Sequence, residues 1–367
     1  MIDRRLVTNF DWTLLGLVSA ICLVGIVNIY SASAAYQMGS GTPYYLKQVN
    51  WMVFGITLSL VVASLDYHIL EDFAHWFYGL LMLLLLAVLL FGRTSLGATR
   101  WLNLGLFSIQ PSELMKIVII IAFARFFNNY HANSGLSVKD MLIPLGLLMA
   151  PVLLIMKQPD LGTAVLVLLI ALSMAFYVGF RWSTIVTFVL VTVPLAWFTW
   201  AVYMKPYQKN RVLDFLNPER SRLGSGYHII QSKIAVGSGG VFGKGYVQGT
   251  QAQLRFLPEQ HTDFAFSVFA EEWGFLGSLV LILLYLSVIL WGLNIARRCN
   301  DRLGGLMAVG VTAMLFWHTM INIGMVIGLF PVVGVPLPFF SYGGTSMITS
   351  MIGVGILQSI SMRRFMF

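Results

Sequence analysis

Residues 259–277 read EQHTDFAFSVFAEEWGFLG and place four carboxylates at the start of a segment that then becomes almost purely apolar. The four are Glu259, Asp263, Glu271 and Glu272, in a chain with only 15 acidic residues. Ionisable side chains are costly inside a lipid bilayer and usually face a partner or a polar cavity. This stretch therefore predicts a polar site at the edge of a membrane.

The composition of the whole chain supports this setting. Hydrophobic residues make up 58% of the 367 residues and charged residues 10%, with a mean hydropathy of +0.80. A soluble domain carries about 25% charged residues, so the sequence predicts a multi-pass membrane protein. The first apolar run, from Trp12, is too long for a signal peptide and lacks an A-x-A cleavage pattern, so we expect it to remain as a span. The net charge of +8 fits basic residues that meet anionic membrane lipids, and we expect no nucleic-acid partner.

A transmembrane helix needs about 20 predominantly apolar residues. By this measure the fold class is an all-α polytopic membrane protein with about ten transmembrane helices, in a single domain over residues 1–367. The candidate spans are 12–31, 50–65, 74–92, 111–127, 141–157, 161–179, 184–204, 266–296, 304–329 and 343–361.

Basic residues in short loops indicate which ends of the spans face the cytoplasm. Many of them fall on one face when the N-terminus is cytoplasmic, namely Arg4, Arg5, Arg125, Lys139, Arg181, Arg297, Arg298, Arg302, Arg363 and Arg364. Both termini are therefore predicted to be cytoplasmic, with one large extracytoplasmic loop, about 205–263, between helices 7 and 8. The outer side of a bacterial membrane offers no nucleotide pool, so a reaction there would need a substrate that is already activated.

Six glycines lie between Gly237 and Gly249 in this loop. They do not form a Walker A motif, because Gly245 follows Lys244 where Ser or Thr is required. Close packing of backbone against backbone is the favoured interpretation. Contact of the backbone N–H groups with a pyrophosphate stays open as the alternative.

Three charged residues fall within or at the edge of the fourth and sixth spans. Glu113 and Lys116 are three positions apart, so they lie on one face of a helix. They either neutralise each other within the bundle or line a polar cavity. Asp160 begins the sixth span, where aspartate commonly caps a helix.

Asp263 stands at the predicted outer end of the eighth span, beside a basic loop. A carboxylate in this place suits a general base or a metal ligand, and it also suits a helix cap. A helix that continues inward from Asp263 would place Glu271 about two turns below it, on a similar face. Glu271 and Glu272 are predicted to be buried partners of a cation or a link to another subunit.

The ninth and tenth spans are joined by the sequence NIGMVIGLFPVVGVPLPFFSYGGTS, residues 322–346. Its prolines and glycines exclude one regular helix through the segment. Irregular backbone at membrane depth must be buried in protein or line a water-filled cavity. Broken segments of this kind occur in transporters, so this feature alone does not distinguish a transporter from an enzyme.

Several long motifs together closely resemble the SEDS family (shape, elongation, division and sporulation). They are RWLNLG (100–105), IQPSELMK (109–116), QPDLGTA (158–164), HIIQSKIAVGSGG (228–240), FLPEQHTDFAFSVFAEEWG (256–274) and the 322–346 segment. The resemblance covers essentially the whole chain. In its compact length and short tails, the chain is more similar to the elongation members of the family than to the division members.

The resemblance implies a peptidoglycan glycosyltransferase that polymerises lipid II into β-1,4 glycan strands, with inversion, for cell-wall elongation and rod shape. The reaction would take place on the outward face of the bacterial cytoplasmic (inner) membrane. Asp263 matches the family's essential aspartate, as the general base or as the ligand of a divalent cation, Mg²⁺ or Mn²⁺. Glu113, Lys116 and Asp160 match the polar residues that support it. No nucleotide cofactor is expected.

The leaving group of this reaction is a pyrophosphate, which basic side chains would neutralise. The candidates for this role are Arg100, Arg211, Lys233 and Lys244, and Glu259 is a further candidate contact to the substrate.

The resemblance also implies partners. We expect a class B penicillin-binding protein that supplies the transpeptidase, other membrane proteins of the elongation complex, and membrane lipids. Two alternatives stay open: a flippase for lipid-linked oligosaccharides such as lipid II, and a structural scaffold for wall synthesis. A flippase predicts its essential carboxylate mid-membrane, and a scaffold predicts that no single carboxylate matters.

Overall fold

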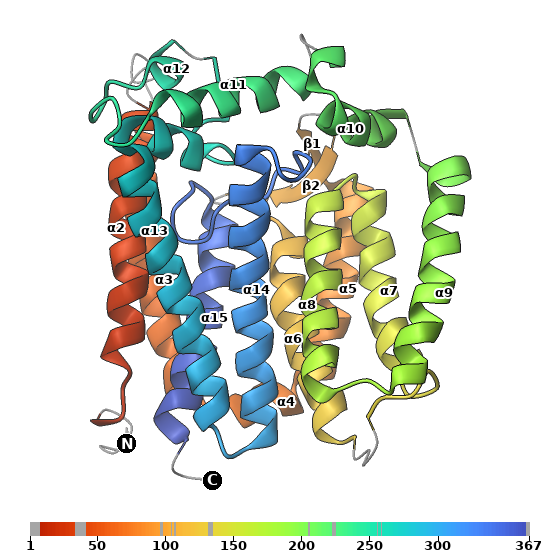
Figure 1. Cartoon of the computed structure of the whole chain (residues 1–367). Helices are drawn as coiled ribbons and strands as arrows, with labels where there is room; N and C mark the ends of the chain where they lie inside the picture. Colours follow the sequence, from red (N-terminus) through yellow and green to blue (C-terminus); the bar gives the residue numbers. More distant parts are fainter. Residues whose placement is uncertain are drawn as a thin grey trace.

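The computed structural model describes residues 8–33, 42–95, 98–103, 105, 108–130, 135–204, 206–221, 225–254, 256–257 and 259–364. Within these residues the chain forms a bundle of long apolar helices that run side by side (Figure 1). The predicted helical membrane protein is confirmed.

Eight of the described helices are long and apolar enough to cross a membrane. They are α2 (Trp12–Ser33), α3 (Tyr44–Ser64), α5 (Ala74–Phe91), α8 (Leu161–Val178), α9 (Trp182–Phe198, continued by the π-helix η2, Thr199–Tyr203), α13 (Ala265–Arg298), α14 (Arg302–Ile327) and α15 (Gly344–Arg363). Two further helices lie beside them in the bundle, α6 (Pro111–Asn128) and the shorter α7 (Leu142–Lys157). The count of ten spans stays a prediction.

The two ends of the bundle differ. α2 begins and α15 ends at one end, which we call the terminal end, whereas short helices cover the opposite end, which we call the loop end (Figure 1). The helices of the loop end are α10 (Pro206–Leu216), η3 (Pro218–Ser221), α11 (Ser225–Ser238) and α12 (Thr250–Gln253), and the short helix α4 (Tyr67–Asp72) lies near the terminal end. This arrangement agrees with one large loop on the side opposite both termini.

A small sheet also forms near the loop end, which the all-helical prediction lacked. Its strands pair antiparallel in the order β1-β2-β3. They are β1 (Arg93–Ser95), β2 (Ala98–Asn103) and β3 (Ser108–Ile109). The backbone groups of the segment between α5 and α6 are not in a helix, so they are satisfied in part by bonding to one another across these strands.

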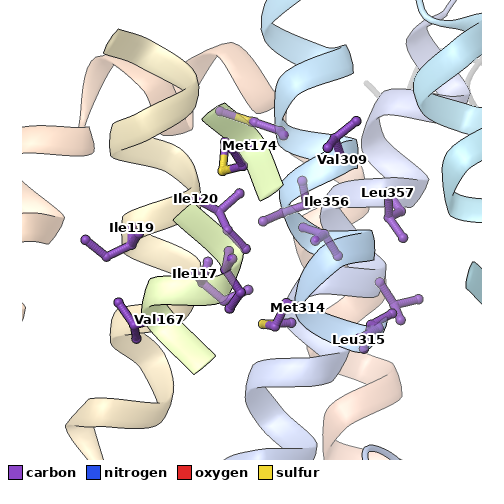
Figure 2. Close-up of a cluster of buried hydrophobic side chains, with 14 of the residues drawn as sticks. Ile117, Ile119, Ile120, Val167, Met174, Val309, Met314, Leu315, Ile356 and Leu357 are labelled. Atoms are coloured by element: carbon purple, nitrogen blue, oxygen red, sulfur yellow. The ribbon is translucent and has the colours of Figure 1, made fainter. Parts of the chain in front are cut away.

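The core of the bundle forms around α14, which packs against α6, α8, α13 and α15. Its small residues, such as Gly310, allow neighbouring helices to approach closely. Figure 2 shows the apolar side chains that meet there, including Ile117, Ile120, Met174, Met314 and Ile356. Interdigitation of these side chains holds α14 in a fixed position, and Asn322 of α14 bonds to the backbone of two residues that line the cavity described below.

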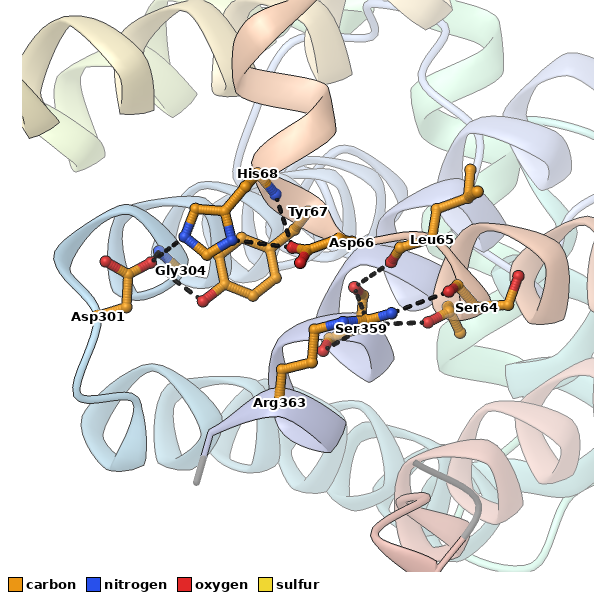
Figure 3. A network of polar contacts seen from close by, with 10 residues as sticks. Ser64, Leu65, Asp66, Tyr67, His68, Asp301, Gly304, Ser359 and Arg363 are labelled. Carbon is orange, nitrogen blue, oxygen red and sulfur yellow. Dashed lines mark hydrogen bonds and ion pairs between the residues drawn. The ribbon is translucent and has the colours of Figure 1, made fainter. Parts of the chain in front are cut away.

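Polar contacts hold the terminal end together (Figure 3). Tyr67 Oη donates to Asp301 Oδ2 at 3.0 Å, and the same oxygen caps α14 by accepting from the N–H of Gly304 at 2.9 Å. Arg363, near the end of α15, donates from Nη2 to the carbonyl oxygen of Ser64 at 2.8 Å. The bond from Tyr67 ties the start of α14 to α4, and the bond from Arg363 ties the end of α15 to the end of α3.

The glycine-rich loop packs its backbone against a break in α13, at Gly274, where the backbone is not helical (φ 65°). The N–H groups of Lys244 and Gly245 donate to the carbonyl oxygens of Glu271 and Glu272 at 3.0 and 3.1 Å. A Cβ atom on Gly243 would lie 2.0 Å from the Glu272 carbonyl oxygen. These contacts support the structural interpretation of the glycines, because only backbone fits between the loop and the helix.

The segment between α14 and α15, residues 328–343, is not helical, and we call it the irregular segment. Its close packing against α2 yields a test. A Cβ on Gly25 would lie 2.7 Å from the backbone of Phe340, whereas a Cβ on Gly16 of the same helix would meet nothing within 4 Å. We expect Gly25→Ala to destabilise the protein by about 1–3 kcal/mol through overpacking. Gly16→Ala should be neutral or stabilising by up to about 1 kcal/mol, because alanine favours the helix. Thermal unfolding of both variants in detergent measures the difference, and equal midpoints would contradict the packing.

Candidate active site

A polar cavity of about 470 Å³ opens at the loop end of the bundle. It lies where the first turns of α6, α8 and α15 meet β2, the loop before α13 and the irregular segment. The residues that line it include Trp51, Arg100, Gln110, Glu113, Thr163, Glu259, Asp263, Gly334 and 342–346. Four of the predicted site residues, Arg100, Glu113, Glu259 and Asp263, thus reach one cavity from distant parts of the chain.

Asp263 precedes α13 without capping it. The N-cap of that helix is Phe264, and no side chain bonds to the first turn. No described residue donates a hydrogen bond to the Asp263 carboxylate, and a Cβ on Gly334 would lie only 3.2 Å from Oδ2. Burial, followed by the negative charge of Glu259, raises the pKa of Asp263 to about 6, although Arg100 opposes the shift. A carboxylate with these properties is suited to take up a proton near neutral pH.

Asn322, on α14, fixes the backbone around Asp263. Its side-chain Nδ2 donates to the carbonyl oxygen of Asp263 at 2.9 Å and to that of Val335 at 2.7 Å. Asn322 is fully buried. One amide group therefore sets the distance between the Asp263 loop and the irregular segment.

Lys116 lies between two side chains in the interior of the bundle. Its Nζ is 2.7 Å from Glu113 Oε2 and 2.6 Å from His318 Nε2. An ammonium group only donates, so His318 Nε2 accepts and its proton sits on Nδ1, which is 3.4 Å from the Pro336 carbonyl oxygen. Glu113 both pairs with Lys116 and lines the cavity. The pair therefore neutralises itself within the bundle and also contributes to a polar cavity, as the two interpretations of the sequence proposed separately.

Asp160 connects two helices beside the cavity. It caps α8 by accepting from Thr163, and Oδ2 also accepts from Gln110 Nε2 at 2.9 Å. Arg100 donates from Nη2 to the carbonyl oxygen of Pro159 at 2.6 Å, and its Nε is 3.9 Å from Asp160 Oδ1. The cap is confirmed, and the same carboxylate joins α6 to α8.

The remaining candidates lie elsewhere. Lys244 pairs with Glu271 at 2.6 Å, so the predicted cation partner of Glu271 is confirmed. Lys233 lies in α11 and packs on Gly328 rather than in the cavity. Arg211 lies in α10, and its side chain is outside what the structure describes.

The expected stacking of Glu271 below Asp263 is wrong. α13 begins only at Ala265, so Asp263 is not part of its helical repeat. The Glu271 carboxylate instead accepts from Lys244 and from Thr250 of the loop. Ser31 donates a short hydrogen bond to Glu272, which holds that side chain against α2.

Sequence reasoning missed His318 and Asn322. A histidine inside a span is an unusual residue that could have been singled out. Asn322 carries no comparable signal, because its partners are backbone carbonyl oxygens that only the fold brings near.

The chain is similar to known proteins over nearly its full length. Residues 11–365 match the family model FTSW_RODA_SPOVE, described as "Cell cycle protein". "Peptidoglycan glycosyltransferase MrdB" of Escherichia coli (strain K12) is 43% identical over 361 residues, which cover 98% of this chain and 95% of that protein. A chain from a structure described as "Structural coordination of polymerization and crosslinking by a peptidoglycan synthase complex" matches with a TM-score of 0.83 and 32% identity over 98% of this chain and 99% of that chain. The crystal structure of the rod shape determining protein RodA of Thermus thermophilus matches with a TM-score of 0.71 and 30% identity over 97% and 98% of the two chains.

The buried pair of Lys116 and Glu113 yields a stability test. Lys116→Met leaves the Glu113 carboxylate without its cation, which should cost about 3–5 kcal/mol. The double variant Glu113→Gln/Lys116→Met removes both charges and should recover most of that loss. Thermal unfolding in detergent measures both, with Lys157→Met, at an exposed lysine, as the control. A double variant less stable than Lys116→Met would contradict the pairing.

Proposed function

The chain belongs to the SEDS family, which includes FtsW, RodA and SpoVE, and we propose that it is a peptidoglycan glycosyltransferase whose reaction takes place in the Asp263 cavity. The observation that carries the site is the Asp263 carboxylate, which accepts no hydrogen bond from a described residue. Asn322 holds the backbone of Asp263 beside a polar cavity at the loop end of a membrane bundle. Similarity to MrdB and RodA supports a role in cell-wall elongation and rod shape.

The proposed substrate is lipid II, as both donor and acceptor. The 4-hydroxyl of the acceptor sugar attacks the anomeric carbon of the donor, and its proton passes to an Asp263 carboxylate oxygen. A β-1,4 glycosidic bond forms while the bond from the anomeric carbon to the diphosphate breaks. The electron pair leaves with the undecaprenyl diphosphate. Because the hydroxyl attacks the face opposite this leaving group, the configuration inverts.

The membrane places the two parts of this substrate. The cavity is polar and lies at the loop end, whereas the helices below it expose apolar side chains suited to a lipid tail. We place the loop end on the outer side of the bacterial cytoplasmic membrane, because the basic residues of many short loops lie at the other end. A site at the outer mouth supports an enzyme over the flippase, which would need its essential carboxylate mid-membrane.

A divalent cation, Mg²⁺ or Mn²⁺, gives the alternative proposal for Asp263, in which its carboxylate would hold the cation instead of accepting the proton. Mg²⁺ is commonly held by one or two carboxylates together with substrate phosphates. Glu259 lines the same cavity as Asp263, and no described cluster of three or more His, Cys, Asp or Glu side chains could hold a metal alone. The donors present thus fit a cation shared with the substrate. When bound, it would neutralise charge on the diphosphate.

The proposed partner is a class B penicillin-binding protein that cross-links the new strands. The support is the similarity to a chain of a complex in which polymerization and crosslinking are coordinated. Other membrane proteins of the elongation complex are expected to join them.

Replacement of the proposed base tests the function. Asp263→Asn keeps the shape of the side chain but removes proton uptake, so we expect lipid II polymerisation to fall by about 10²–10⁴-fold. The measurement is glycan-chain formation by the purified protein in detergent, with the transpeptidase partner and Mg²⁺ present. Asp140→Asn, at an acidic residue far from the cavity, should keep full activity. Equal products from Asp263→Asn and wild type would rule out the assignment.

The raised pKa of Asp263 yields a pH test. Only the ionised carboxylate accepts a proton, so kcat/KM should rise with pH and level off above the pKa of about 6. Glu259→Gln removes a negative charge that raises this pKa, so the rising limb should move to lower pH. Rates over a pH series at constant divalent cation measure the limb, and Glu219→Gln, outside the cavity, serves as the control. A limb that stays in place in Glu259→Gln would contradict the role of Asp263.

A further inference from the structure

The first turn of α15 opens into the Asp263 cavity. All four residues at this start, Gly343, Gly344, Thr345 and Ser346, line the cavity. The first described backbone bond of the helix runs from the N–H of Met347 to the carbonyl oxygen of Gly343 at 2.9 Å. The four N–H groups of 343–346 therefore have no acceptor among the described residues, as expected at an uncapped helix start.

Two side chains in this turn are buried and also lack partners. Thr345 and Ser346 are only 5% and 8% exposed, yet no described residue hydrogen-bonds either hydroxyl. Neither hydroxyl oxygen is among the fully buried oxygens that lack a partner, so both keep accessible surface at the cavity that their residues line. Ser359 in the same helix instead donates to the carbonyl oxygen of Leu65 at 2.7 Å. Unused hydroxyls beside unused N–H groups point to a ligand with several acceptor oxygens.

The backbone around this turn is held in place before any ligand arrives. The N–H of Tyr342 donates to the carbonyl oxygen of His261 at 2.9 Å, and Gln48 Nε2 donates to that of Ser341 at 3.1 Å. Trp51 covers Gly344 so closely that a Cβ there would lie 2.5 Å from its ring. The donors of the first turn thus have fixed directions.

The electrostatics of the turn favour an anion. A helix start carries partial positive charge, and α15 has no acidic residue in its first turn. The other two helices that begin at the cavity already have a carboxylate at their start, since α6 carries Glu113 in its first turn and α8 is capped by Asp160. Arg100 adds a cation to the cavity, and its buried Nε has no hydrogen-bond partner among the described residues.

We propose that the first turn of α15 binds the diphosphate of the lipid-linked donor, through the N–H groups of 343–346 and the hydroxyls of Thr345 and Ser346. The inference rests on the proposed function, because that function supplies a diphosphate as the leaving group. As the bond to the anomeric carbon breaks, the electron pair remains on the diphosphate oxygen. These donors and Arg100 then stabilise the added charge.

Binding of a short prenyl diphosphate tests the site without any turnover. We expect Thr345→Val/Ser346→Ala to weaken binding of farnesyl diphosphate to the purified protein by about tenfold or more, because each variant side chain loses a hydrogen bond to a charged group. Thr345→Ser keeps a hydroxyl and should bind within about threefold of wild type. Thr349→Val is the matched control, since its buried hydroxyl also lacks a described partner but does not line the cavity.

The outcomes separate the site from the function. Unchanged binding in the double variant, with wild-type polymerisation intact, would overturn the diphosphate site and leave the glycosyltransferase proposal standing. Weakened binding in a protein whose wild type makes no glycan would support the site and overturn the function. Thermal unfolding shows whether the double variant folds, and if it does not, Ser346→Ala alone takes its place with the same expectation of a severalfold loss.

Discussion

One buried amide holds the two halves of the site together. Asn322 donates to the carbonyl oxygens of Asp263 and Val335, which belong to two segments that are not helical. Backbone without regular structure is tolerated at membrane depth only where protein groups satisfy it. Further side chains do the same for the irregular segment, including Tyr285, which donates to Pro338, and Ser341, which accepts from the N–H of Leu337. The cavity exists because these bonds keep a broken backbone open inside a tightly packed bundle.

The charges around the cavity divide into two classes. Glu113 is paired with Lys116, Glu271 with Lys244, and Asp160 accepts from several donors. Asp263 alone among these carboxylates accepts no hydrogen bond from a described residue, and its pKa is raised. Paired carboxylates support the structure, whereas the unpaired one is available for chemistry. Of the four acidic residues in 259–277, Glu271 thus belongs to the first class and Asp263 to the second.

Features that depend on local sequence were predicted well, and features that depend on distant contacts were not. Composition and periodicity identified the membrane helices, and spacing alone placed Glu113 beside Lys116. His318 was missed because it lies 202 positions from Lys116, its partner in the fold. Glu271 was misplaced because the start of α13, at Ala265, depends on how the preceding loop is held. The small sheet was missed because its strands are too short for an alternating pattern to show.

The packing of the last helix has a consequence for biosynthesis. α15 packs more extensively against α3 than against any other element, and Arg363 completes that contact at the terminal end. Roughly 280 residues separate the two helices, which at about 5–20 residues per second takes a ribosome tens of seconds to translate. Until α15 has been made, α3 lies in the membrane without the helix that it contacts most. The bundle therefore closes only when its final segment has been inserted, so a chain interrupted before α15 leaves an early helix exposed to quality control.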